Sequence, residues 1–483
     1  MADCSLLITN ALVVTMDPLR RVIPDGFVAV DGRDIIGVGG ADECTFVSDR
    51  VIDARGGAVL PGFVNAHTHS LDLLLRGGPC DDRSLYDWLT NVVDPGCGAY
   101  RPEDVATATE MYCLEAVRSG ITTVVDSVEV PMDAWDDTAD SMLDVYGRSG
   151  LRTVYALMFY DHIDPAVLAR LDAADQRPEP YRTDFGAMTD LDDALAGIER
   201  LMERHHGGAD GRISVWPSPG VAVFCSREAF RRADELAQRF GVMTTVHVCE
   251  SDVDEHQAGM RGIRYLESIG YLSPRVLAGH CVQLDVGDVM ALARSGAKVA
   301  NNPVSNMFLG NGIAPVAELL AAGVDVGIGT DDANCNGTAN MLADLKVAAL
   351  AQKARYRDAA AITAEQVLEM ATIGGARAVG MADEIGSLEV GKRADLIVID
   401  LDRPHLVPRH GIASVLVYQA LGDEVRTTVV DGRVIMEDRV VPWLDDTGEA
   451  DLMVRAQAAA ERVLVDGHLP AEAGAVWRSV PAG

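Results

Sequence analysis

Four histidines and one aspartate stand where short apolar runs of the sequence end. The segment PGFVNAHTHS carries His67 and His69, two residues apart, so both imidazoles would point to the same side of a strand. TTVHVCESD, VLAGHC and VGIGTDDANC carry His247, His280 and Asp331. Imidazoles and a carboxylate together form a ligand set that suits zinc or iron(II). These five residues therefore predict a metal centre.

The runs before these residues belong to a regular alternation of strands and helices. Helical patterns such as 102–119 and 226–240 separate eight predicted strands, at 63–66, 121–126, 152–158, 213–217, 243–247, 276–280, 298–301 and 324–330. Eight such units indicate an α/β chain with a closed, TIM-like (β/α)8 barrel, and no GxGxxG follows an early strand to favour an open sheet. Barrel active sites lie at the carboxyl ends of the strands, where the five residues fall.

Both ends of the chain have a different, β-rich pattern. VAVDGRDII at 28–36 and TVVDGRVIM at 428–436 each place Asp-Gly between β-branched runs, which is a strong hairpin signal. A helical joint at 363–381 opens with a capping box of Thr363 and Gln366. We expect three parts: a composite β-sandwich from residues 1–60 and 385–447, the barrel from 61–384, and a C-terminal helical tail from 448–483.

The charge balance restricts the partners. The 483 residues include 41 Lys plus Arg and 73 Asp plus Glu, a formal net charge of −32. Such a surface repels polyanions, so we expect a small neutral or cationic ligand and neither a nucleic-acid nor a membrane partner. Nine scattered cysteines without a CxxC pair, and an N-terminus without a basic n-region, favour the reducing cytoplasm.

Lysine is scarce, and this limits the metal chemistry. Only four lysines occur, and the first 297 residues contain none. Dinuclear barrel hydrolases usually bridge their metals with a carbamylated lysine on a strand between the HxH pair and the next histidine. No lysine lies between His69 and His247, so one metal ion per chain is expected unless another carboxylate or a cysteine bridges two.

Long segments resemble the amidohydrolase superfamily, in its mononuclear cytosine deaminase-like branch. Within that branch the chain is especially similar to the triazine hydrolases, of the atrazine chlorohydrolase and melamine deaminase types. The resemblance covers nearly the whole chain and includes the segments LPGFVNAHTH at 60–69, LYDWLTNVV at 85–93, EAVRSGITT at 115–123, VSNMFLGNGIAPV at 304–316, VGIGTDDANCN at 326–336 and GSLEVGKRADLIVID at 386–400. A homo-oligomer, dimer or larger, is also expected.

The resemblance implies a role for each residue of the predicted centre. One divalent ion, zinc with iron(II) as the alternative, would be held by His67, His69, His247 and Asp331. Glu250 would shuttle protons, and His280 would touch the metal-bound water or complete the ligand set. A metal lowers the pKa of bound water towards ~7, Asp331 can accept its proton, and Glu250 can protonate a ring nitrogen.

The implied reaction is hydrolytic deamination. Hydroxide would attack the amino-bearing carbon of an N-heterocycle (a triazine, a pyrimidine or a purine-like ring), and ammonia would leave. In dechlorinating relatives the ligand aspartate is followed by Asn and, three residues further on, by Ser; deaminating relatives have Asp and Cys, as Asp332 and Cys335 here. Leu85 also follows the deaminating pattern. A carboxylate can relay the proton that a departing amine needs, whereas chloride needs none. A helix-capping role for Asp332 and a packing role for Cys335 are the alternatives.

Departures from the resemblance fall near the expected substrate pocket. Asp72 and Cys97 stand where triazine enzymes of this type carry glutamine, which puts melamine itself in doubt as the substrate. Asp72 could recognise an amino or amidine face. The other predicted pocket residues are Trp88, Met158, Asn306 and Phe308.

Three other functions stay open. The first is removal of chloride or an alkylamine from the same kind of ring, against which Asp332 and Cys335 argue. The second is ring opening of a cyclic amide, which the missing bridging lysine disfavours. The third is an inactive barrel that serves as a binding protein, which the complete ligand set with Glu250 disfavours.

Overall fold

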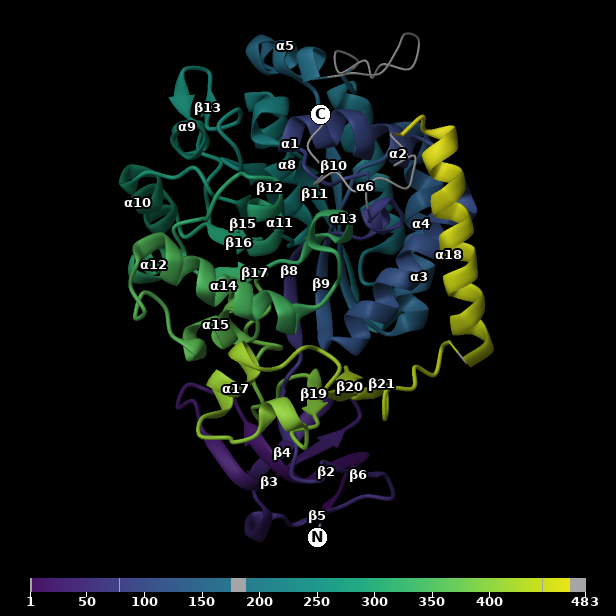
Figure 1. The fold of residues 1–483 in the computed structure, drawn as a ribbon, viewed down its shortest axis with the longest axis vertical. Helices are drawn as coiled ribbons and strands as arrows, with labels where there is room; N and C mark the ends of the chain where they lie inside the picture. The colour runs from purple at the N-terminus through teal and green to yellow at the C-terminus, as the bar shows by residue number, and fades with distance from the viewer. Residues whose placement is uncertain (1, 78, 175–187, 445, 470–483) are drawn as a thin grey trace, which may run out of the picture.

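The computed structural model describes residues 2–77, 79–174, 188–444 and 446–469, and it contains the predicted barrel (Figure 1). Eight parallel strands pair in chain order: β8 (Phe63–His69), β9 (Ile121–Val128), β10 (Arg152–Phe159), β11 (Ile213–Pro219), β12 (Thr244–Val248), β15 (Val276–His280), β16 (Lys298–Asn301) and β17 (Val326–Ile328). Strand β17 returns to pair with β8, and the amide of His247 donates to the carbonyl of Gly220 at 2.9 Å, which joins β12 to the end of β11. All eight predicted strands are present, and the barrel prediction is confirmed.

Helices cover the outside of the barrel, which explains why its strands are continuous apolar runs. The covering helices are α3 (Pro102–Arg118), α4 (Trp135–Ser149), α6 (Leu191–His205), α8 (Arg227–Phe240), α10 (Val286–Ser295), α12 (Val316–Ala321) and α14 (Met341–Tyr356). The predicted joint at 363–381 is two helices, α15 (Ala364–Met370) and α16 (Ile373–Ala378), because the backbone of Thr372 leaves the helical region (φ −123°, ψ −106°). The capping box that begins α15 is confirmed: the Gln366 amide donates to Thr363 Oγ1 at 3.2 Å.

Strands from both chain ends form one eight-stranded sheet beneath the barrel (Figure 1). Its strands are β21 (Arg433–Met436), β20 (Val425–Val430), β19 (Leu396–Ile399), β7 (Ala58–Pro61), β2 (Leu6–Val14), β3 (Val22–Asp31), β4 (Asp34–Gly40) and β6 (Val51–Asp53). The two ends meet where β7 pairs antiparallel with β19. Both Asp-Gly hairpins form, and in the second Asp431 and Gly432 have φ of 53° and 74°, as a type I′ turn requires.

Further helices, most of them short, lie above the carboxyl ends of the barrel strands or along its side. They include η2 (Ser70–Leu75), α1 (Leu85–Trp88), α2 (Asp94–Gly98), α5 (Pro165–Ala174), α9 (Gly262–Ser268), α11 (Pro303–Phe308), α13 (Ala333–Asn336), α17 (Ile412–Tyr418) and α18 (Asp446–Asp466). Helix α18 packs along α3, where Arg118 donates to both carboxylate oxygens of Glu449 at 2.6 and 2.8 Å (Figure 1).

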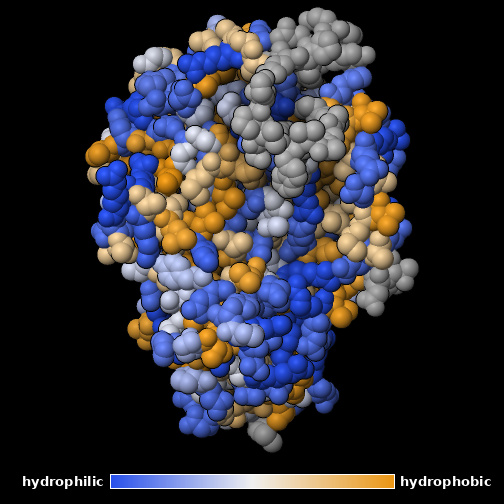
Figure 2. All heavy atoms as spheres, in the orientation of Figure 1, coloured by the Kyte–Doolittle hydropathy of each residue, from blue (hydrophilic) through white to orange (hydrophobic). Residues whose placement is uncertain are grey.

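On the face shown in Figure 2, hydrophilic side chains gather over the lower centre and right of the molecule, near β20 and β21, and apolar side chains are scattered among polar ones elsewhere. Among the described residues, no helix has the length and apolar character needed to cross a bilayer.

A buried ion pair joins the barrel to the sheet. Arg152, at the start of β10, donates to both carboxylate oxygens of Asp395, just before β19, at 2.9 and 3.1 Å. Asp395 also accepts the amide of Asp431 at 2.7 Å, and both members of the ion pair are buried. This contact lies at the amino ends of the barrel strands, away from the ends that carry the predicted site.

We predict that Arg152→Leu destabilises the protein by about 3–5 kcal/mol, because the Asp395 carboxylate would stay buried without its partner. Urea denaturation measures this loss. The matched control is Arg200→Leu, whose partner Asp136 is exposed, and its cost should be below about 1 kcal/mol. Equal losses in the two variants would contradict a structural role for the buried pair.

Candidate metal centre and active site

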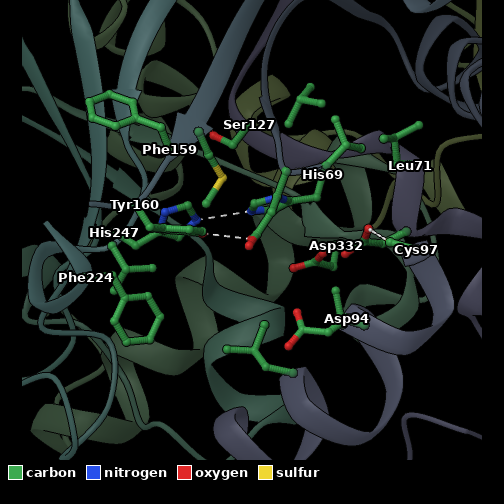
Figure 3. Close-up of a pocket in the computed structure, with 18 of the residues that line it drawn as sticks. His69, Leu71, Asp94, Cys97, Ser127, Phe159, Tyr160, Phe224, His247 and Asp332 are labelled. Atoms are coloured by element: carbon green, nitrogen blue, oxygen red, sulfur yellow. Dashed lines mark hydrogen bonds between the residues drawn. The ribbon is translucent and has the colours of Figure 1, made fainter. Parts of the chain in front are cut away.

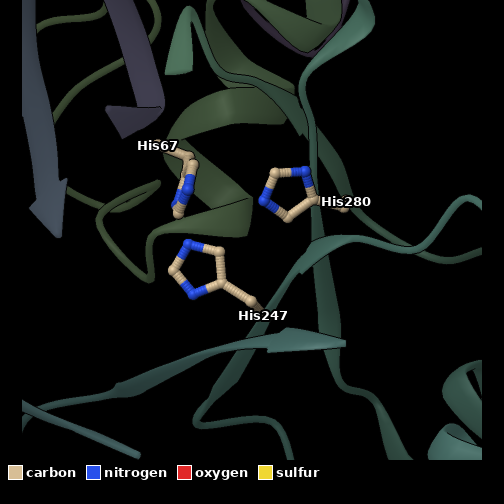
Figure 4. Close-up of side chains that lie close together, drawn as sticks. All are labelled: His67, His247 and His280. Atoms are coloured by element: carbon tan, nitrogen blue, oxygen red, sulfur yellow. The ribbon is translucent and has the colours of Figure 1, made fainter. Parts of the chain in front are cut away.

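Three histidine nitrogens converge at the carboxyl ends of the barrel strands. His69 Nε2 lies 3.2 Å from His67 Nε2 and 3.1 Å from His247 Nε2. Figure 4 shows the rings of His67, His247 and His280 turned towards one another. His67, His247 and His280 can offer ligand atoms within 4.8 Å of one another, and so can His67, His69 and Asp331. The structure therefore brings the five predicted residues together.

The donor atoms fit a metal ion. Nitrogen atoms that share a zinc ion at about 2.0–2.1 Å are separated by roughly 3.3 Å, close to the spacing here. The carboxylate of Asp331 lies beside them, with Oδ1 3.3 Å from His67 Nε2, and among the described residues neither of its buried oxygens has a hydrogen-bond partner. A buried carboxylate without such partners is costly, and a cation compensates it.

Hydrogen bonds and burial prepare the imidazoles as ligands. His247 Nδ1 donates to the carbonyl of Gly220 at 2.7 Å, so Nε2 keeps its lone pair for a metal. Burial lowers the pKa of His67 to about 4, and burial together with the neighbouring imidazoles lowers the pKa of His247 well below 6.5. Both rings are therefore neutral at physiological pH, as metal ligation requires.

Polar residues of β8 hold the loop that carries Asp331. Thr68 Oγ1 donates to the carbonyl of Asp331 at 2.9 Å, and the amide of Thr330 donates to Asn65 Oδ1 at 2.9 Å. Asp331 and His280 have left-handed backbones, with φ of 58° and 67°. Such conformations are unfavourable for residues other than glycine and collect at functional sites. The barrel thus stabilises a strained loop in order to aim the carboxylate.

Glu250 follows β12 and lies beside His280. Glu250 Oε1 is 3.4 Å from His280 Nδ1 and accepts a hydrogen bond from Asn311 Nδ2 at 3.0 Å. Burial raises the pKa of Glu250 well above its ordinary value, and the nearby carboxylates of Asp331 and Asp254 raise it further. A carboxyl group that can hold a proton near neutral pH suits acid–base chemistry. His280 Nδ1 lies 3.0 Å from Asn306 Oδ1, so Asn306 orients the ring.

A cavity of about 410 Å3 opens above these residues. Its floor includes His69, His247, Glu250, His280 and Asp331, and apolar side chains form much of its wall. In Figure 3, Tyr160, Phe224 and His247 lie on one side of this cavity, and Asp332, Cys97 and Asp94 lie on the other.

Most predicted pocket residues line this cavity: Asp72, Leu85, Trp88, Cys97, Met158 and Asp332. Cys97 Sγ donates to Asp72 Oδ1 at 3.2 Å. Burial raises the pKa of Asp332 well above its ordinary range, and a hydrogen bond with the carboxyl group of Asp72 raises it further, because two adjacent carboxylates repel. The two acids thus share one wall of the cavity.

Three predicted pocket residues lie outside the cavity lining. Phe308 was expected in the wall, but it ends the short helix α11 and its side chain is 41 % exposed. Cys335 is buried behind the wall, in an apolar cluster with Leu85 and Trp88. Asn306 contacts His280 instead of the cavity. Each lies on a helix or turn whose direction depends on packing against distant segments.

Sequence reasoning missed several polar residues of the site. Asn311 bonds Glu250, and Gly220 orients His247 through its carbonyl group. Glu129 and Tyr160, both in the cavity lining, directly follow β9 and β10. Their position one residue beyond a barrel strand was a signal that could have found them.

Comparison with known proteins agrees with the fold and the site. The amidohydrolase family model matches residues 58–435. The chain is 35 % identical over 472 residues to an S-triazine hydrolase of Gordonia rubripertincta, covering 94 % of this chain and 97 % of the relative. It is 37 % identical over 468 residues to a 5′-deoxyadenosine deaminase of Methanosarcina barkeri, covering 96 % and 99 %. An adenosine deaminase structure from Xanthomonas campestris with bound zinc superposes with a TM-score of 0.84 at 30 % identity, covering 96 % of this chain and 99 % of that one.

The fold and the site thus define a metal-dependent hydrolase barrel. The chain belongs to the amidohydrolase family, and the resemblance to this family found in the sequence is confirmed. It is an enzyme that hydrolyses carbon–nitrogen bonds other than peptide bonds.

We predict that His67→Ala removes the bound metal, because an imidazole is lost from the centre of the cluster. Elemental analysis of the purified protein should find one metal ion per wild-type chain and much less than one in the variant. The control is His162→Ala, since this residue lies outside the cluster. Full metal content in the His67 variant, or two ions per wild-type chain, would contradict the proposed ligand set.

Proposed function

We propose that this enzyme hydrolytically deaminates an amino-substituted N-heterocycle. The observation that carries the proposal is that two acids, Glu250 and Asp332, line a largely apolar cavity beside the cluster of histidines and Asp331. Such a cavity accommodates a flat ring, and the acids can supply protons to a ring nitrogen and to a departing amine. The names of relatives that are deaminases of adenosine derivatives support the same reaction class.

The proposed metal ligands are His67, His69, His247 and Asp331, with zinc as the proposed ion and iron(II) as the alternative. The ion, when bound, would lower the pKa of a water molecule so that hydroxide forms at neutral pH. No lysine lies between His69 and His247 to bridge a second ion, which supports one ion per chain.

Glu250, His280 and Asp331 are the proposed catalytic residues. Glu250 gives a proton to the ring nitrogen beside the amino-bearing carbon, so that this carbon becomes more electrophilic. Asp331 accepts a proton from water. His280, held by Asn306 through Nδ1, presents Nε2 as an acceptor that takes a hydrogen bond from the attacking water and keeps it oriented.

The leaving amine must be protonated before it departs. Asp332 lies next to Asp331 and lines the cavity, so we assign it this proton transfer. Asp72, which contacts Asp332, is proposed to bind an amino or amidine group of the ring. Leu85, Trp88 and Met158 are proposed as the walls for the ring, and Cys97 and Cys335 as residues that hold the two acids and the wall in place.

A small heterocyclic molecule is thus the proposed partner of the site. Its ring, a triazine, a pyrimidine or a purine-like base, can be found by measuring ammonia release from guanine, cytosine, isocytosine, pterin, 5′-deoxyadenosine and aminotriazines with the zinc-loaded enzyme. Absence of ammonia from all of them would count against the proposal. The domain boundaries, the homo-oligomeric state and the cytoplasmic location stay predictions of the sequence.

We predict that Glu250→Gln keeps the metal but lowers kcat by ~10²–10⁴, because glutamine cannot exchange a proton. Ammonia release and metal content measure the two effects. Asp252→Asn is the matched control, because Asp252 is exposed on the same loop and does not line the cavity. Near-normal turnover by the Glu250 variant would move the proton transfer elsewhere, with His280 as the next candidate.

A second prediction separates deamination from dechlorination, the reaction that stays the alternative. Asp332→Asn with Cys335→Ser should lower kcat/KM for an amino-substituted ring by about 10²-fold, and far less for the matching chloro-substituted ring, which needs no proton to leave. Because Cys335 lies behind the wall, Cys335→Ser alone should have the smaller effect. Equal losses on both rings would mean that these residues only shape the cavity.

A further inference from the structure

Besides Asp72 and Asp332, the cavity contains a second pair of polar residues, which lies away from the cluster of histidines and Asp331. Glu129 follows β9 and Tyr160 follows the adjacent strand β10, and Tyr160 donates its hydroxyl to Glu129 Oε2 at 2.8 Å. Both residues line the cavity, and Glu129 is exposed to its open space. The other carboxylate oxygen, Oε1, has no hydrogen-bond donor within the described part of the chain.

A short stretch of backbone at the end of β9 separates Glu129 from the proposed metal ligands. Ser127 lies in β9, lines the cavity, and its hydroxyl is 3.5 Å from His67 Nδ1. Glu129 is two residues further on, which in an extended chain keeps the same side and adds about 7 Å. A ring that reaches the metal centre would therefore leave Glu129 beside a substituent of that ring.

Packing holds Tyr160 in place. Its ring lies edge-on to Phe224, with centroids 5.5 Å apart at 84°. A side chain at position 220 would collide with the Tyr160 ring, so Gly220 permits this close approach. Because Gly220 also accepts the hydrogen bond from His247, Tyr160 is positioned by the same backbone that orients a proposed metal ligand.

The surroundings of this pair are apolar. Val130, Pro131, Met132, Phe159 and Phe224 line the same cavity. The charged side chains among the described lining residues, histidines aside, are all acids: Asp72, Asp94, Glu129, Glu250, Asp331 and Asp332. A fixed carboxylate in such surroundings binds a cation or a neutral hydrogen-bond donor more strongly than it would in water.

We infer that Glu129 and Tyr160 form a subsite that binds a hydrogen-bond donor, an ammonium or a hydroxyl group, on the substituent of the substrate ring. Glu129 makes the contact, and Tyr160 positions its carboxylate. The inference deepens the proposed function, because it assumes that a ring occupies the metal end. According to this inference, the substrate is a heterocycle whose substituent, here called its arm, carries an ammonium or a hydroxyl group.

Three probes of equal size test this inference: 2,4-diamino-1,3,5-triazines whose 6-substituent is 3-aminopropyl, 3-hydroxypropyl or butyl. Their Kd values for the zinc-loaded protein are measured by calorimetry, and kcat/KM by ammonia release. The wild type should bind the ammonium arm at least about 10-fold more tightly than the butyl arm, as expected for a charge-assisted hydrogen bond. The stronger of the two polar arms identifies whether an amine or a sugar-like hydroxyl is the natural donor.

Glu129→Gln should remove most of the preference for the ammonium arm, a loss of about 10-fold, while the hydroxyl arm keeps most of its advantage because the amide oxygen still accepts. Tyr160→Phe should weaken both preferences without a change in the binding of the butyl probe. Asp133→Asn is the matched control: it removes a negative charge that is close in sequence, exposed and outside the cavity lining, so it should leave the ratios unchanged.

Equal Kd values for the three arms in the wild type would overturn the inference, and so would an ammonium preference that survives Glu129→Gln. Failure of the proposed function is a different result. In that case no ring in the ammonia screen reacts, while the calorimetric ratios still report on the Glu129 subsite.

Discussion

The buried carboxylate of Asp331 is the constraint on which the site depends. Its two oxygens have no hydrogen-bond partner in the part of the chain that the structure describes, and the neutral imidazoles of His67 and His247 cannot compensate its charge without a cation. A divalent ion satisfies the carboxylate and the imidazoles together. The surrounding structure brings the imidazoles and the carboxylate to one point and keeps their polar atoms buried there.

The barrel meets this constraint because parallel strands deliver residues distant in sequence to one edge. His67 and His69 end the first strand, His247 the fifth and His280 the sixth, and Asp331 follows the eighth. The loops that aim them are strained, as the left-handed backbones of His280 and Asp331 show. Stability comes from elsewhere: a continuous apolar core between strands and helices, and the Arg152–Asp395 pair that joins the barrel to the sheet at the opposite end.

Above the metal centre, acids are distributed over three places in an otherwise apolar cavity. Glu250 lies at the floor, Asp72 and Asp332 share one wall, and Glu129 lies further out with Tyr160. Each place suits a different group of one substrate molecule: a ring nitrogen, an amino group, and a hydrogen-bond donor on a substituent. This distribution also agrees with the strongly acidic composition of the chain, which favours neutral or cationic ligands.

The eight barrel strands, the two Asp-Gly hairpins, the Thr363 capping box and the imidazoles and carboxylate at the strand ends could all be predicted from the amino-acid sequence. These features depend on local periodicity and turn chemistry, and a barrel brings strand ends together by its topology alone. The exposure of Phe308, the position of Cys335 behind the wall, and the contacts of Asn306 and Asn311 with His280 and Glu250 became visible in the folded chain alone. The same holds for the pairing of Glu129 with Tyr160. Those contacts join loops and short helices far apart in the chain, and their directions follow from packing between distant segments, which no local pattern encodes.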